Sequence, residues 1–264
     1  MPTETAQPPE ALPAPGTRMR GEDAEMTFTE HLAELRTRLL ISIATVAIVS
    51  LAAFPLMPGL LKLVQAYFIP GVQLHVFSPP EVIRVYIKLS LLVGLVVGFP
   101  VVLSQLYAFV APALDKRLRS RVVWYAIPSL LMSLVGIAFC GMVVLPLVMR
   151  ALLGLTKSSG LEGTYQLDPT VGFIIILLAI FAIMFQLPIV LSLLASVGIV
   201  NAKLLMDKWR HATLIIFILA GIGAPDGNPL TMLLLAAPLI VLYLLSIVVV
   251  ALTQPKVEAA SKPA

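Results

Sequence analysis

Charged side chains are scarce in this sequence. Asp, Glu, Lys and Arg together make up 12% of the 264 residues, whereas hydrophobic residues make up 59%. A soluble globular domain carries about 25% charged residues, so the composition excludes an ordinary water-soluble domain. The apolar residues form continuous runs of about 20, the length that a helix needs to cross a bilayer. Because these runs do not alternate with polar residues, membrane-spanning strands are excluded as well.

Catalytic and redox motifs are also absent from the sequence. It contains no G-x-S-x-G or H-E-x-x-H motif, and its single cysteine, Cys140, excludes an intrachain disulfide. The three histidines, His31, His75 and His211, fall on separate loops or span ends, so they do not form a metal-spaced cluster. No basic stretch is interleaved with aromatic residues, which argues against nucleic-acid binding. We therefore expect no enzymatic activity and no metal or other cofactor.

What the sequence has instead is a series of long apolar segments. We expect one all-α integral membrane domain over residues 26–251, with a disordered cytoplasmic tail at 1–25 and a second cytoplasmic tail at 252–264. The six predicted spans are 37–56, 82–110, 122–150, 170–199, 209–224 and 229–251. Most Lys and Arg residues lie before the first span, after the last, or in the second and fourth links between spans. The positive-inside rule therefore places both termini in the cytoplasm.

The spans also carry signals for the shape of the bundle. As a helix, residues 211–224 of the fifth span would be only about 21 Å long, and the tight link "APDGNP" adds little, so we expect the fifth and sixth spans to be short. Prolines inside the spans predict kinked helices in a cupped bundle. These prolines are Pro100, Pro128, Pro146, Pro188 and Pro238. In "GLLKLVQAYF", at residues 59–68, helical spacing of apolar residues predicts a short amphipathic helix on the outer membrane face.

The centres of the spans hold almost no ionisable residues, which argues against an ion-coupled transporter. Gln186, in "MFQLPIV", is the one clear polar residue deep in a span, and the nearby Pro188 frees a backbone carbonyl. Two roles for Gln186 stay open, a hydrogen bond between helices of this chain or contact with a helix of another protein. A membrane facilitator for a small solute is the alternative function.

Polar residues gather at the cytoplasmic ends of the spans. The segment "EHLAELRTRLL" places Glu30 and Glu34 four residues apart, so a helix here carries two like charges on one face. This arrangement is unfavourable unless a cationic group binds to it, and we therefore predict a cytoplasmic docking face. Arg38 lies four residues after Glu34, the spacing of an ion pair within one helix.

Several of these segments together resemble one protein family. "HLAELRTRLL" resembles the start of TatC, the multi-spanning receptor subunit of the twin-arginine protein translocase. "SPPEVIRVYIKLSLL" resembles the family's entry into the second span and "FPVVLSQLYAFVAPAL" the end of that span, while "GIVNAKLLMDKWRHA" and "APDGNP" resemble the links on either side of the fifth span. The resemblance covers residues 27–250. Matching positions expected to shape loops and helix ends are Pro79, Glu81, Gln105, Pro112, Arg210 and Asp226.

The resemblance implies a function in protein export. TatC recognises twin-arginine signal peptides at the cytoplasmic face and, with TatA- and TatB-type single-span partners, moves folded proteins across the membrane using the proton-motive force. For this chain it implies the same task in a bacterial or archaeal cytoplasmic membrane, and assembly into a homo-oligomer. It also implies a cupped bundle with short fifth and sixth spans.

A signal-peptide site follows from the same resemblance. Glu34 matches the family's signal-contacting glutamate, and a carboxylate suits the planar, bidentate guanidinium of arginine. Arg36, Phe109 and Asp115 are the other residues expected to bind the signal peptide. We expect three leucines to hold this helix against the bundle while Glu34 faces outward. These leucines are Leu32, Leu35 and Leu39.

Two of the positions that depart from the family pattern bear on the predicted sites. The family's second signal-binding glutamate is replaced by Leu118, and Asp115, three residues earlier, is the candidate to substitute for it. The membrane-embedded glutamate of some relatives is replaced by Gln186, which keeps the polarity without the charge. Together with Pro188, Gln186 is expected to contact the helix of a TatA- or TatB-type partner.

Overall fold

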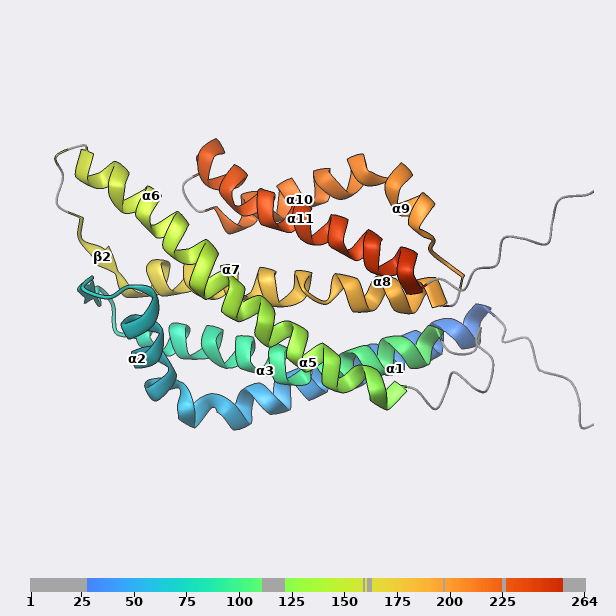
Figure 1. Cartoon of the computed structure of the whole chain (residues 1–264). Coiled ribbons are helices and arrows are strands. Elements are labelled where there is room, and N and C mark those ends of the chain that lie inside the picture. Colours follow the sequence, from blue (N-terminus) through green and yellow to red (C-terminus); the bar gives the residue numbers. More distant parts are fainter. Residues whose placement is uncertain are drawn as a thin grey trace, which may run out of the picture.

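The structure, a computed structural model, is an all-helical bundle with one minimal sheet (Figure 1). It describes residues 28–110, 122–158, 160, 163–196, 198–224 and 227–253. The helices are α1 (Phe28–Ala53), α2 (Met57–Phe68), α3 (Pro80–Val110), α5 (Val122–Phe139), α6 (Leu145–Ser158), α7 (Leu167–Met184), α8 (Leu187–Ser196), α9 (Ala202–Asp207), α10 (Trp209–Gly223) and α11 (Pro229–Thr253). Strands β1 (Leu74–His75) and β2 (Tyr165–Gln166) pair in parallel. The predicted tail at 1–25 and most of that at 252–264 lie outside the described residues.

Five helical stretches are long and apolar enough to cross a membrane, and one shorter apolar helix accompanies them. The long stretches are His31–Phe68, Pro80–Phe109, Ile127–Gly154, Leu167–Ser196 and Pro229–Leu252, and the shorter helix is Trp209–Gly223. The all-α class is confirmed, and so is the short fifth span, because α10 has 15 residues.

The expectation of a short sixth span is wrong, since α11 runs for 25 residues. Two local features explain its length. The side-chain oxygen of Asn228 accepts a hydrogen bond from the backbone N–H of Leu230 at 2.9 Å, so the helix starts immediately after the link. Pro238 lies inside the helix without ending it.

The prolines of the spans have two different outcomes. Helices α3, α5 and α11 continue through Pro100, Pro128 and Pro238. Pro188, however, follows the break between α7 and α8, where its missing N–H leaves the Met184 carbonyl without its helical donor. Pro146 follows a π-helical segment, Cys140–Val144, which joins α5 to α6. Figure 1 shows α6 diverging obliquely from α3.

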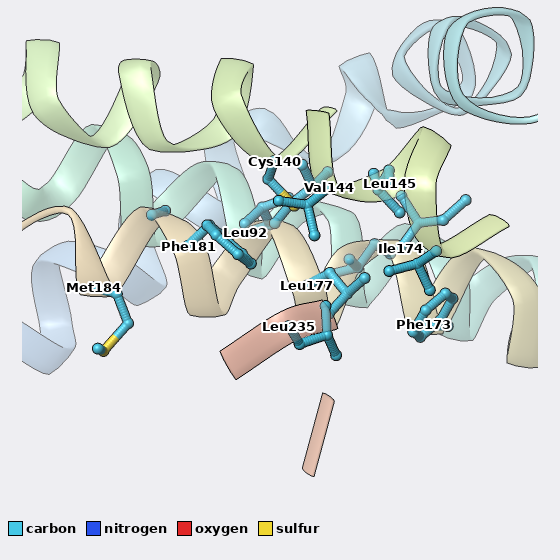
Figure 2. Packing of buried hydrophobic residues seen from close by; sticks show 14 of the residues in the cluster. Leu92, Cys140, Val144, Leu145, Phe173, Ile174, Leu177, Phe181, Met184 and Leu235 are labelled. Carbon is cyan, nitrogen blue, oxygen red and sulfur yellow. The ribbon is translucent and has the colours of Figure 1, made fainter. Parts of the chain in front are cut away.

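Helix α3 organises the bundle because it packs against α1, α5 and α7. Helix α7 is buried along most of its length, and Figure 2 shows its Ile174, Leu177 and Phe181 close to Cys140 and Val144 of the π-helical segment. In a bilayer, lipid chains solvate apolar side chains as well as protein does, so helices associate through close packing rather than through the hydrophobic effect.

Glycine permits the closest approach between α1 and α3. A Cβ atom added at Gly94 would overlap the Ser50 hydroxyl and lie 2.6 Å from the Val46 carbonyl oxygen. At Gly98, one turn later, it would lie 3.2 Å from Cγ2 of Val46. This Gly-x-x-x-Gly spacing therefore fixes α1 against α3 and determines where the polar start of α1 meets the end of α3.

The amphipathic helix predicted between the first two spans is present as α2. Its Met57, Leu61 and Val64 are buried, while Leu63 and Tyr67 are exposed. At its end, the Phe68 ring covers Gly141, where an added Cβ would lie 2.6 Å from Phe68 Cε1.

Candidate functional site

The carboxylate of Glu34 lies between the start of α1 and the end of α3. Arg38 donates two hydrogen bonds to Glu34 Oε1, one of them from Nε at 2.9 Å. The same guanidinium donates from Nη1 to the Gln105 side-chain oxygen at 3.4 Å. The ion pair predicted from the four-residue spacing is confirmed, and Gln105 extends it from α1 to α3.

The second oxygen of Glu34 is left without a hydrogen bond. Oε2 is shielded from solvent and has no donor among the residues that the structure describes. Nδ1 of His31 lies 3.8 Å from Oε2, which exceeds hydrogen-bonding distance. An unpaired, shielded acceptor is unfavourable by about 1–3 kcal/mol. Arg38 therefore fixes Oε1 of Glu34, whereas Oε2 would be stabilised by any new hydrogen-bond donor.

An aromatic pair lies beside this carboxylate. The His31 ring stacks on the Phe109 ring with centroids 4.3 Å apart and planes 16° from parallel. His31 comes from the first turn of α1 and Phe109 from the last turn of α3. The predicted site residues Glu34 and Phe109 are thus brought into one cluster, and His31, Arg38 and Gln105 complete it.

Of the other predicted signal-peptide residues, the structure describes Arg36 alone, and Arg36 is not in this cluster. Arg36 is exposed, and at about 100° per residue it points roughly 200° around the helix from Glu34. Asp115 lies outside the described residues, as do Pro112 and Leu118.

The predicted orientation of α1 is wrong. Leu32, Leu35 and Leu39 are 48%, 42% and 56% exposed, whereas the Glu34 and Arg38 side chains are 18% and 23% exposed. The polar face packs on α3 and the leucines face outward. In soluble proteins leucines face the core and charged groups face outward. In a membrane protein the reverse is favourable, because lipid solvates leucine and charged groups are stabilised by protein partners.

Gln186 forms a contact between helices of this chain. It is 4% exposed, and its Nε2 donates to the Ser129 carbonyl oxygen of α5 at 2.9 Å. Its Oε1 has no donor within the described ranges. Pro188 is buried at the adjacent helix break. The interhelical role is confirmed, and contact with a partner helix stays a prediction.

A second polar cluster lies at the opposite end of α3. Glu81 is fully buried, and its Oε1 accepts hydrogen bonds from Ser78 Oγ at 3.1 Å and from Gln166 Nε2 at 2.6 Å. Pro79, which is exposed, precedes α3 directly. Through its hydrogen bond from Gln166, Glu81 therefore joins the start of α3 to β2, the strand that leads into α7.

The same cluster contains ion pairs that the sequence did not reveal. Asp168, in the first turn of α7, accepts from Arg84 Nε at 3.0 Å and from Lys88 Nζ at 2.6 Å. The lysine reaches it across Gly172, where a Cβ would lie 3.1 Å from Nζ. Eighty residues separate the partners in sequence, so no local spacing indicates the pair.

The remaining predicted loop positions lie near the fifth span. Arg210 is exposed, and its guanidinium lies 5.8 Å from the centre of the Trp209 ring. Tyr243 of α11 donates its hydroxyl to the Leu205 carbonyl at 2.7 Å, which ties α9 to the bundle. Asp226 lies outside the described residues.

Comparison with known proteins places these features in a family context. The family model for the Sec-independent protein translocase protein TatC matches residues 30–238. A TatC protein of Aquifex aeolicus is 35% identical over 226 residues, which is 84% of this chain and 93% of that relative. A TatC protein of Listeria innocua is 30% identical over 237 residues, 89% of this chain and 96% of that relative. A crystal structure of the twin arginine translocase receptor TatC is similar at a TM-score of 0.75 and 34% identity, covering 85% of this chain and 99% of that one.

Proposed function

Since the chain belongs to the TatC family and is a receptor subunit of the twin-arginine translocase, we propose that its Glu34 cluster binds the arginine pair of twin-arginine signal peptides. As a TatC protein it is a multi-pass, non-enzymatic transport component. The proposal extends to export of folded proteins with TatA- and TatB-type partners, driven by the proton-motive force, with both termini cytoplasmic. Family membership favours this function over a small-solute facilitator.

The unpaired Oε2 of Glu34 is the observation that carries the proposal. Arg38 occupies Oε1 and holds the carboxylate in place. Oε2 is shielded from solvent and has no donor among the described residues, so an incoming guanidinium that displaces the atoms covering it gains a fixed acceptor. Charge-assisted hydrogen bonds of this kind are roughly twice as strong as neutral ones. Phe109 lies close by on α3 and offers an apolar surface to the same peptide.

The replacement of the second acid by Leu118 bears on how arginine is recognised. With Leu118 in that place, Glu34 provides one carboxylate of the site. We propose that Asp115, in the segment that follows α3 in the sequence, provides a second. Discrimination between arginine and lysine then rests on the geometry around Glu34, because both side chains carry the same charge.

Binding of matched peptides tests this proposal. The chain is placed in lipid nanodiscs, and its affinity is measured for one signal peptide in Arg-Arg and Lys-Lys forms. We expect Glu34→Gln to weaken binding of the Arg-Arg form by about tenfold or more, the equivalent of about 1.4 kcal/mol. Asp115→Asn is expected to have a smaller effect in the same direction.

Asp207→Asn is the matched control, because Asp207 is an exposed acid at the end of α9 and its neutralisation changes net charge equally. The proposal is wrong if Glu34→Gln binds the Arg-Arg peptide as tightly as the wild type. It is also wrong if the control weakens binding as much as Glu34→Gln does.

A partner helix at Gln186 is a separate part of the proposal. The support is that Oε1 of Gln186 lacks a donor within the described residues while Nε2 is already used. Photocrosslinking from position 186 in membranes containing TatA- and TatB-type proteins should capture one of them. The exposed Ile183, on the last turn of α7, and the buried Leu193 of α8 serve as neighbouring positions. If no partner is crosslinked from any of the three positions, Gln186 has its interhelical role alone.

A further inference from the structure

The stacked rings of His31 and Phe109 form a flat surface across the junction of α1 and α3. Phe109 covers one face of the imidazole, because the ring planes are 16° from parallel at a centroid distance of 4.3 Å. The His31 side chain nevertheless remains 41% exposed, so part of the ring is accessible from outside. Phe109 therefore supports a histidine ring that a ligand can reach.

This aromatic surface adjoins the unpaired oxygen of Glu34. His31 Nδ1 lies 3.8 Å from Oε2, close enough to be its neighbour and too far to be its hydrogen-bond donor. Arg38 is already engaged with Glu34 Oε1 and with Gln105 of α3, so it does not donate to Oε2. An aromatic face and a free carboxylate oxygen thus lie side by side.

We propose that His31 is a specificity-determining residue of the signal-peptide site, with its ring as the platform on which one guanidinium of the arginine pair stacks while donating to Glu34 Oε2. This inference rests on the function proposed above. A guanidinium is planar and weakly hydrated, so it can stack through its face and donate hydrogen bonds from its edge at once. A lysine ammonium can donate to the carboxylate but has no planar face to stack.

The platform therefore stabilises arginine selectively. It supplies a basis for preferring arginine to lysine in a chain where Leu118 takes the place of the expected second acid. A structural role for His31 would have a different signature, because loss of packing at the α1–α3 junction would weaken both peptides alike.

Three variants separate these roles. His31→Leu removes the aromatic face, His31→Phe keeps it without the nitrogen atoms, and His211→Leu makes the same exchange at an exposed histidine of α10. Affinities for the Arg-Arg and Lys-Lys signal peptides are measured in nanodiscs, with Glu34→Gln alongside. Stacking of a cation on an aromatic ring predicts that His31→Leu loses about 3- to 30-fold in affinity for the Arg-Arg peptide. Binding of the Lys-Lys peptide should not change.

His31→Phe should retain the arginine preference, and His211→Leu should match the wild type. The inference is overturned if His31→Leu keeps the ratio of the two affinities, if it weakens both peptides equally, or if His31→Phe loses the preference as well. Should His31→Leu fail to fold, the His31→Phe variant and a His31→Gln variant decide, because only the former keeps an aromatic face. If Glu34→Gln abolishes the preference while His31→Leu retains it, the proposed function stands and only the platform is wrong.

Discussion

Lys88 and Asp168 join the second and fourth long helices of the bundle, with Nζ of the lysine 2.6 Å from Oδ1 of the aspartate. The pair lies at the end of the molecule opposite Glu34, where Arg84 adds a second bond to the same carboxylate. Polar side chains thus tie each end of α3 to a neighbouring helix, through Asp168 at one end and through the hydrogen bond from Arg38 to Gln105 at the other.

Neutralising Asp168 should loosen the end of the bundle where it lies. Asp168→Asn leaves Arg84 and Lys88 without their counter-charge, and loss of hydrogen bonds to a charged group predicts destabilisation by about 1–3 kcal/mol. Thermal unfolding in detergent measures the effect, with the exposed Asp207→Asn as control. Because the Glu34 cluster lies at the other end of α3, the signal-peptide preference should not change, and a selective loss of that preference would contradict this assignment.

Gly94 should tolerate no larger residue. An alanine there would overlap Ser50 and lie 2.6 Å from the rigid Val46 carbonyl, so α1 and α3 would have to separate. Such overpacking is expected to destabilise the protein by about 1–3 kcal/mol. Gly154→Ala in α6 is the control, because an added Cβ meets no atom of the described chain within 4 Å. That control should be neutral or slightly stabilising, since alanine favours helix over glycine. Equal melting temperatures for the two variants would refute the close-packing argument.

The contact between Phe68 and Gly141 should be visible in a double-mutant cycle. Gly141→Ala places a Cβ 2.6 Å from the Phe68 ring, which should displace α2 and lower the melting temperature. Adding Phe68→Leu removes the clash, so the double variant should be more stable than the sum of the single effects predicts. Strict additivity would show that α2 does not depend on this contact.

The orientation proposed from the positive-inside rule can be tested by labelling. Val76, after β1, is 52% exposed and predicted to lie outside the cell, whereas Met206 of α9 is 61% exposed and predicted to lie inside. A membrane-impermeant maleimide should label Val76→Cys in intact cells and Met206→Cys only after permeabilisation. If Met206→Cys is labelled in intact cells and Val76→Cys only after permeabilisation, the proposed orientation is wrong.

The sequence predicts the helices well because hydropathy is a local property. Apolar runs located all six spans, and the four-residue spacing of Glu34 and Arg38 gave their ion pair. The bounds predicted for the sixth span, 229–251, agree closely with those of α11, Pro229–Thr253. Only the expectation that this span is short was wrong, because a tight link before a helix does not limit how far the helix runs.

The contacts between helices could not be predicted from local sequence. Gln105 and Phe109 approach α1 only because Gly94 and Gly98 allow α3 to lie against it. The outward turn of Leu35 follows from lipid as the solvent, which a pattern of apolar residues cannot distinguish from a protein core.

Because Cys140 is buried, the wild-type protein should give no background signal in thiol labelling. Cys140 is the only cysteine in the sequence and is 0% exposed at the start of the π-helical segment. A bulky aqueous reagent therefore has no native target in the folded receptor. Each cysteine introduced on the surface reports its own environment without any prior change to the wild-type chain. Reactivity that arose at Cys140 would be a direct signal that the junction of α5 and α6 had opened.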